Sequence, residues 1–145
     1  MVERHFSQQV FISCSTDEFE RADASFAGLR TCLAKYLRRA ECHVRVQEDF
    51  SQTHEDTLEK LNRYIQHCDV VIHIVGSKPG AVASAVAVQS YLKSEPRFLE
   101  ELPDLRDRLE DFNGITYAQW EAFIALHHAR PLLVYCTDDG FATQQ

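Results

Sequence analysis

The segment that most constrains the fold is the apolar run from Val70 to Val75, within "DVVIHIVG". Its β-branched residues suit a strand that is covered on both faces, as strands in the middle of a parallel sheet are. A helical pattern comes directly before it, with one apolar face made of Leu58, Leu61, Ile65 and Cys68. A helix that leads straight into a buried strand is typical of α/β proteins, so we predict a parallel sheet with helices packed on it.

The N-terminal part of the chain shows the same alternation. "QQVFIS" (8–13) is a strand signal, and Ser15-x-x-Glu18 has the form of a capping box, so we expect a helix from Ser15 or Thr16. Apolar residues then recur every three or four positions, which predicts one long amphipathic helix through Phe19, Ala22, Phe26, Leu29, Leu33, Tyr36 and Ala40. Arg30 lies off that stripe. "CHVRVQ" (42–47) is the second predicted strand.

Residues 81–113 interrupt this pattern, and we predict that they form a helical insertion. "AVASAVAVQSYL" has the composition of a buried helix, and the charged segment after it is broken at Pro103. Thr116-x-x-Gln119 repeats the capping-box pattern and starts the next helix, and "RPLLVYC" is a fourth strand. Right-handed crossovers then give a doubly wound α/β sheet of order 2-1-3-4. The fourth strand is an edge strand, which either the tail of the chain covers or a longer protein protects. We expect a single domain over 1–145, cut from the N-terminus of a longer protein.

Composition and charge narrow the functional classes. With 145 residues, 45% of them hydrophobic and 26% charged, the chain fits one soluble domain. A net charge of −7, with no basic cluster larger than Arg38–Arg39, argues against nucleic acid or an anionic membrane as the main partner. No apolar run approaches the roughly 20 residues that span a bilayer, so we expect a cytoplasmic protein. The five cysteines lack CxxC spacing and fall mostly in apolar segments, which favours reduced core thiols over disulfides or a metal site.

The segment "ITYAQWEAFIALHH" (115–128) has a carboxylate where a core residue is expected. At helical spacing, the stripe that faces the core consists of Tyr117, Trp120, Ile124 and His127. Glu121 lies within this stripe, too far from the predicted N-cap Thr116 for capping or the helix dipole to account for it. A carboxylate there is costly unless it is paired or opens into a wet cleft. Two interpretations carry equal weight: a structural carboxylate, salt-bridged or exposed by a small helix rotation, and an active-site residue.

The carboxyl ends of the strands are where a ligand is expected, because open α/β sheets bind ligands at the switch point between strands 1 and 3. This places three segments around one crevice: "SCSTD" (13–17), "EDF" (48–50) and "GSKPG" (76–80). None of them carries a P-loop or a GxGxxG fingerprint, which excludes the usual nucleotidase and dinucleotide motifs. The Ser13–Ser15 turn suits a phosphate or ribose but also a plain helix cap, and Phe50 suits base stacking or local packing.

Three segments together resemble the TIR-like superfamily: "VFISCSTDEFE", "DVVIHIVG" and "GITYAQWEAFIALHHARPLLVY". The resemblance is strongest to a bacterial branch of unknown function, found at the N-termini of large multidomain proteins with nucleotidase or repeat regions. The positions that match its pattern are Phe11, Ile12, Ser13, Thr116, Tyr117, Glu121, Ala125 and Pro131. The chain departs from the family in three ways: its tryptophan is adjacent to the glutamate, its insert is long, and the last strand and helix of a complete TIR domain are missing.

The resemblance implies a flavodoxin-like fold and, in catalytically active relatives, cleavage of the nicotinamide–ribose bond of NAD by one helix glutamate, which Glu121 matches. NAD is then a substrate, and no cofactor or metal is implied. The residues expected to contact it are Ser13, Cys14, Ser15, Phe50, Gly76, Ser77, Tyr117 and Trp120. We therefore expect an effector domain of antiphage defence or signalling that acts when its parent protein self-associates. The alternatives are a non-catalytic homotypic interaction module and a nucleotide-binding domain similar to the nucleoside deoxyribosyltransferases.

Overall fold

The computed structural model describes residues 8–15, 19, 27–46, 57–76, 80–108 and 114–137. The strands are β1 (Gln9–Ser13), β2 (His43–Val46), β3 (Val70–Val75) and β4 (Leu132–Cys136). The helices are α2 (Leu29–Arg39), α3 (Thr57–His67), α4 (Ala85–Ser94), α5 (Phe98–Glu101), α6 (Pro103–Arg108) and α7 (Tyr117–His127). All four strands are parallel and lie in the order β2-β1-β3-β4. The predicted α/β class, strand order and flavodoxin-like arrangement are confirmed.

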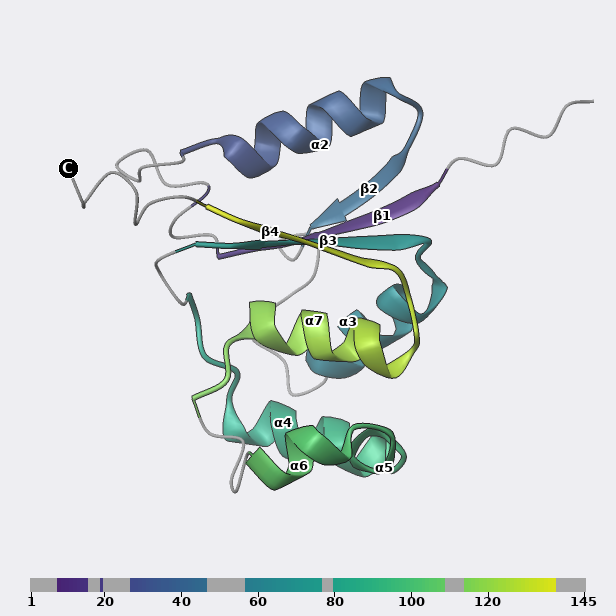
Figure 1. Cartoon of the computed structure of the whole chain (residues 1–145), viewed down its shortest axis with the longest axis vertical. Coiled ribbons are helices and arrows are strands. Elements are labelled where there is room, and N and C mark those ends of the chain that lie inside the picture. The colour runs from purple at the N-terminus through teal and green to yellow at the C-terminus, as the bar shows by residue number, and fades with distance from the viewer. Residues whose placement is uncertain are drawn as a thin grey trace, which may run out of the picture.

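The molecule is built in layers, as Figure 1 shows. Helix α2 covers one face of the sheet, α3 and α7 cover the other, and α4, α5 and α6 lie beyond α3 and α7. Two cores result. The smaller one, under α2, includes Val10, Ile12 and Ile72, and the larger one, around α7, includes Trp120 and Phe98. Alternate residues of β1 and β3 enter different cores, because successive side chains of a strand point to opposite faces.

The helices of the insertion follow the predicted pattern. In α4, Ala87, Val88 and Tyr91 are buried, and the helix contacts α3. The break predicted at Pro103 is confirmed: α5 ends at Glu101, and Pro103 is the first residue of α6. Proline is well tolerated at that position because its missing N–H has no partner in the first turn of a helix. The insertion thus adds a layer to the α3–α7 side of the sheet.

The single long helix predicted from Ser15 to Ala40 is wrong in its continuity. Phe19 does lie in a helical turn, and its N–H donates to the Ser15 carbonyl at 3.1 Å; positions 16–18 and 20–26 lie outside the described residues. However, α2 begins only after Gly28, whose φ of 76° is left-handed. The stripe therefore changes phase: Arg30 is only 2% exposed, whereas Tyr36 is 72% exposed. Periodicity across a left-handed glycine does not describe one helix face.

The sequence analysis predicted that the cysteines are mostly buried in the core as reduced thiols. All five cysteines are free, but only Cys14 and Cys68 are buried, Cys42 is half-buried, and Cys32 and Cys136 are exposed. The expectation of mostly core thiols is therefore wrong for Cys32, which lies on the outer side of α2, and for Cys136, at the end of an edge strand.

Among the described helices, none is both long and apolar enough to cross a bilayer.

Candidate functional site

Helix α7 begins with the predicted capping box, which anchors it beside the carboxyl ends of the strands. The Thr116 hydroxyl accepts from the Gln119 N–H at 3.1 Å, and the Gln119 side chain accepts from the Thr116 N–H at 2.9 Å. These bonds satisfy two backbone donors that a helix start leaves open. The Tyr117 N–H also donates to the Ala81 carbonyl at 3.0 Å, so the segment after β3 holds the start of α7.

Glu121 lies on the face of α7 that packs toward the sheet, and its side chain is 0% exposed. Neither of its carboxyl oxygens forms a hydrogen bond with a described residue. Burial raises the pKa of Glu121 to about 8, while the nearby Ser13 hydroxyl and the Arg30 guanidinium lower it to a smaller extent. The group is therefore largely protonated at neutral pH. Arg30 acts on it electrostatically, but no described residue forms a salt bridge with it.

Ser13 and His73 face Glu121 from the sheet. They are register partners on β1 and β3, both are buried, and Ser13 Oγ lies 2.9 Å from His73 Nδ1. The Ser13 hydroxyl also donates to the Ala118 carbonyl of α7 at 3.2 Å. Burial lowers the pKa of His73, so the imidazole is neutral. In serine hydrolases the nucleophile bonds to one imidazole nitrogen and the acid to the other. Here the Glu121 carboxyl group forms no hydrogen bond with His73, so the three residues do not form that triad.

The turns after β1 and β3 meet beside this cluster, as the topology predicts. Ser15 Oγ is buried and forms no hydrogen bond within the described part of the chain. Gly80 packs directly against it: a Cβ at Gly80 would lie 2.9 Å from Ser15 Oγ, and its φ of +82° is left-handed. Only glycine fits this position without a shift of its neighbour. The contact closes the carboxyl end of the β1–β3 pair.

The structure brings some of the predicted contact residues together and separates others. Ser13 and Ser15 lie at the cluster, and Tyr117 is buried at the start of α7. Cys14 packs instead in the core under α2. Trp120 is directed to the insertion, with its ring centroid 6.0 Å from Tyr91 and 5.5 Å from Phe98.

Gly76 is half-buried directly after β3, and Phe50 and Ser77 lie outside the described residues. His73 is the site residue that periodicity along the chain does not reveal. Its signal is a single imidazole inside a run of β-branched residues, at a position that must face one of the two cores.

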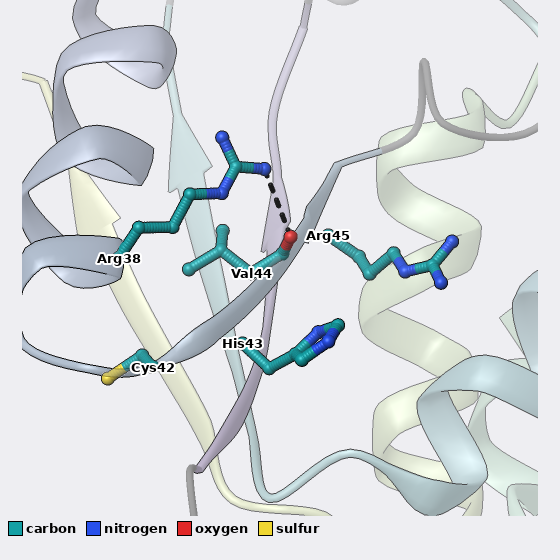
Figure 2. A pocket seen from close by; sticks show the side chains of 5 residues that line it. All are labelled: Arg38, Cys42, His43, Val44 and Arg45. Carbon is teal, nitrogen blue, oxygen red and sulfur yellow. Dashed lines mark hydrogen bonds between the residues drawn. The ribbon is translucent and has the colours of Figure 1, made fainter.

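A pocket lies at the outer edge of β2 (Figure 2) and has a volume of about 420 Å³. Arg38 reaches over from α2 and donates to the Val44 carbonyl at 3.1 Å, while His43 and Arg45 point to the other side of the strand. The Arg45 guanidinium lies 5.5 Å from the centre of the Tyr64 ring. Arg38 thus covers part of the outer edge of β2. Within the described ranges, no group of three His, Cys, Asp or Glu residues is arranged to hold a metal ion.

These observations define the class of protein: a flavodoxin-like α/β domain with a buried carboxyl group on α7, facing the switch point between β1 and β3. The chain belongs to the family described as "Domain of unknown function (DUF4062)", which matches residues 9–145. No curated protein matches the chain.

Proposed function

We propose that this chain is a TIR-like effector domain that hydrolyses the nicotinamide–ribose bond of NAD through Glu121. One observation carries the proposal: a carboxyl group that has no hydrogen-bond partner among the described residues is buried at the switch point of a flavodoxin-like sheet. An unpaired buried carboxyl group is costly to folding, and groups of this kind concentrate at functional sites. The resemblance of the α7 segment to TIR-like domains assigns the catalytic glutamate to the same position.

The chemistry suits a single carboxylate. The nicotinamide ring of NAD carries a positive charge and leaves as a neutral molecule, so no acid has to protonate it. The bond between its nitrogen and the ribose C1′ breaks through a state with positive charge on the sugar, which an ionised Glu121 stabilises. Water then adds to C1′ and loses a proton, and the products are nicotinamide, ADP-ribose and a proton. The active form is the carboxylate, so we expect the rate to rise with pH as Glu121 ionises.

Access to Glu121 requires a change in the surrounding structure, because its side chain is fully buried. Assembly of several copies, as in TIR relatives, is the proposed trigger. The elements that have to part are the turn at Ser15 and Gly80 and the start of α7, which together cover the carboxyl end of β1 and β3. A chain that is silent in dilute solution and active when crowded fits this scheme.

The test is release of nicotinamide from NAD, measured by chromatography, with the chain held at high local density on beads. Glu121→Gln removes the charge and keeps the shape of the side chain. Glu100→Gln makes the same change at an exposed position of α5 and serves as the matched control. We expect product from the wild type and from Glu100→Gln but none from Glu121→Gln. Equal release by all three, or no release from the wild type, would reject the proposal.

The second candidate is a non-catalytic interaction module, and one observation favours it. The edge strand β4 exposes the apolar side chains of Leu133, Val134 and Tyr135, and exposed apolar patches of this kind mark interaction surfaces. In this case Glu121 is structural, and its replacement by glutamine leaves assembly unchanged. Concentration-dependent assembly without any nicotinamide release would favour the module over the enzyme.

A further inference from the structure

The pair formed by Ser13 and His73 is unusual for the centre of a parallel sheet. Both residues are buried on the two central strands, at positions where an apolar residue would pack without any polar group to satisfy. Each is the other's partner, at 2.9 Å, and both point to the α7 side of the sheet, where Glu121 lies. A polar pair kept in such a place needs a reason other than packing.

A count of protons fixes how the pair is bonded. A serine hydroxyl has one proton to donate, whereas a carbonyl oxygen only accepts. The contact between Ser13 Oγ and the Ala118 carbonyl therefore uses the hydroxyl proton. The contact with His73 must then run the other way, with the imidazole donating its Nδ1–H to Ser13 Oγ. Burial keeps His73 neutral, which is the state with one N–H to place.

The hydrogen bond from Ser13 to the Ala118 carbonyl is weak, and its loss costs little. Its length of 3.2 Å exceeds the usual separation of about 2.7–2.8 Å for a hydroxyl donor. The Ala118 carbonyl lies in the first turn of α7, where the regular helix pattern supplies it with a second donor. Rotation of the Ser13 hydroxyl thus leaves no orphaned carbonyl behind.

We propose that Ser13 and His73 are positioning residues for Glu121. The Ser13 hydroxyl, held by the Nδ1–H of His73, donates to Ala118 while Glu121 is protonated and turns to the carboxylate when Glu121 ionises. The pair supplies the hydrogen bond that the buried carboxylate otherwise lacks. This inference rests on the proposed function only for the statement that the carboxylate is the working form.

Besides burial, two described groups act on Glu121: the Ser13 hydroxyl on β1 and the Arg30 guanidinium on α2, while His73 on β3 contacts Ser13. Arg30 stays charged throughout the working pH range, and His73 is neutral. The Ser13 hydroxyl is therefore the group that can change its bonding in step with Glu121. Removal of the Ser13 hydroxyl should therefore make the ionisation of Glu121 less favourable.

The experiment follows the ionisation of Glu121 directly, by the carbon-13 carboxyl resonance of the labelled chain, identified by its absence in Glu121→Gln. Ser13→Ala removes the donor, and Ser13→Cys replaces it with a weak donor of similar shape. Ser94→Ala, which removes a hydroxyl from a bond to the Tyr91 carbonyl in the insertion, is the matched control. We expect the acid dissociation constant of Glu121 to fall about tenfold in Ser13→Ala, to fall less in Ser13→Cys, and to stay unchanged in Ser94→Ala.

An unchanged dissociation constant in both Ser13 variants, with folded spectra, would overturn the inference. If Ser13→Ala does not fold, Ser13→Cys decides it alone. The readout does not depend on NAD cleavage, so a failure of the proposed enzyme and a failure of this inference are distinguishable. Where nicotinamide release is observed, its pH profile must move to higher pH in Ser13→Ala together with the resonance.

Discussion

At the scale of single residues, the cost of burying a carboxylate determines how Glu121 behaves. In water a glutamate ionises near its ordinary pKa of 4.5, but burial raises the pKa of Glu121 to about 8. Between these values the folded chain holds a proton that the unfolded chain has lost. Stability must therefore depend on pH in the opposite sense to that of a salt-bridged glutamate.

The contribution of Glu121 to folding should be full below about pH 4.5 and be lost as pH rises toward about 8. The free energy of unfolding then falls by up to about 1.4 kcal/mol per pH unit in this window. Glutamine carries no such proton, so Glu121→Gln should match the wild type near pH 5 and exceed its stability near pH 8. Urea denaturation of both proteins across this range measures the difference. If the free energies of unfolding of the two proteins differ by the same amount at every pH, the expected protonation of Glu121 is contradicted.

The sequence identified Glu121 but not its neighbours. Helical spacing alone places Glu121 on the buried stripe with Trp120 and Ile124, and all three are fully buried. Spacing says nothing of Ser13 and His73, because a pair 60 residues apart in the chain is joined only by the register of β1 against β3. The site's central residue was therefore predictable, whereas its hydrogen bonds were not.

At the scale of elements, Asn62 joins α3 to α4 and to His128, the residue directly after α7. Its side-chain oxygen accepts from the Tyr91 hydroxyl at 2.8 Å and lies 2.7 Å from His128 Nε2. Its amide nitrogen donates to Glu95 at 3.2 Å. One buried side chain thus holds the insertion against the helix that carries Glu121. Burial and the neighbouring His127 lower the pKa of His128, so His128 is neutral and has one N–H to donate.

Asn62→Ala should destabilise the chain by about 2–4 kcal/mol, because it leaves a buried tyrosine hydroxyl and an imidazole without their acceptor. The matched control is Gln66→Ala, on the exposed side of the same helix, which should change stability by less than about 0.5 kcal/mol. The midpoint of urea unfolding measures both. Equal effects of the two substitutions would show that the network contributes nothing beyond helix propensity.

At the scale of the whole molecule, the two edges of the sheet differ. The outer edge of β2 is covered by Arg38, which bonds to the Val44 carbonyl. The other edge strand, β4, carries no charged side chain, and four of its five residues are exposed. A long apolar edge strand of this kind is prone to pair with other chains. No described strand pairs with the outer side of β4, and the tail of the chain (138–145) lies outside the described residues.

Val134→Lys should reduce concentration-dependent association, because a lysine on an edge strand opposes pairing with another apolar strand. Val134 is 52% exposed, and Val86→Lys on α4, where the valine is 53% exposed, makes the same change away from β4. Sedimentation velocity over a range of concentrations compares the two variants with the wild type. Association that falls equally in both would point to net charge, and not to β4, as the cause.

The sequence by itself determined the alternation of strands and helices, the strand order, the capping box of α7 and the position of Glu121 on the core-facing stripe of that helix. Each of these follows from local periodicity or from the handedness of crossovers, which act over short stretches of chain. Only the tertiary structure decided that Arg30 and not Tyr36 faces the sheet, that His73 bonds to Ser13, and that Asn62 ties the insertion to α7. The hydrogen bonds among them join residues that are 60, 29 and 66 positions apart in the sequence, so they depend on how the elements pack against one another. The physical reason is that burial and hydrogen bonding are properties of the neighbours in space, which periodicity along the chain does not specify.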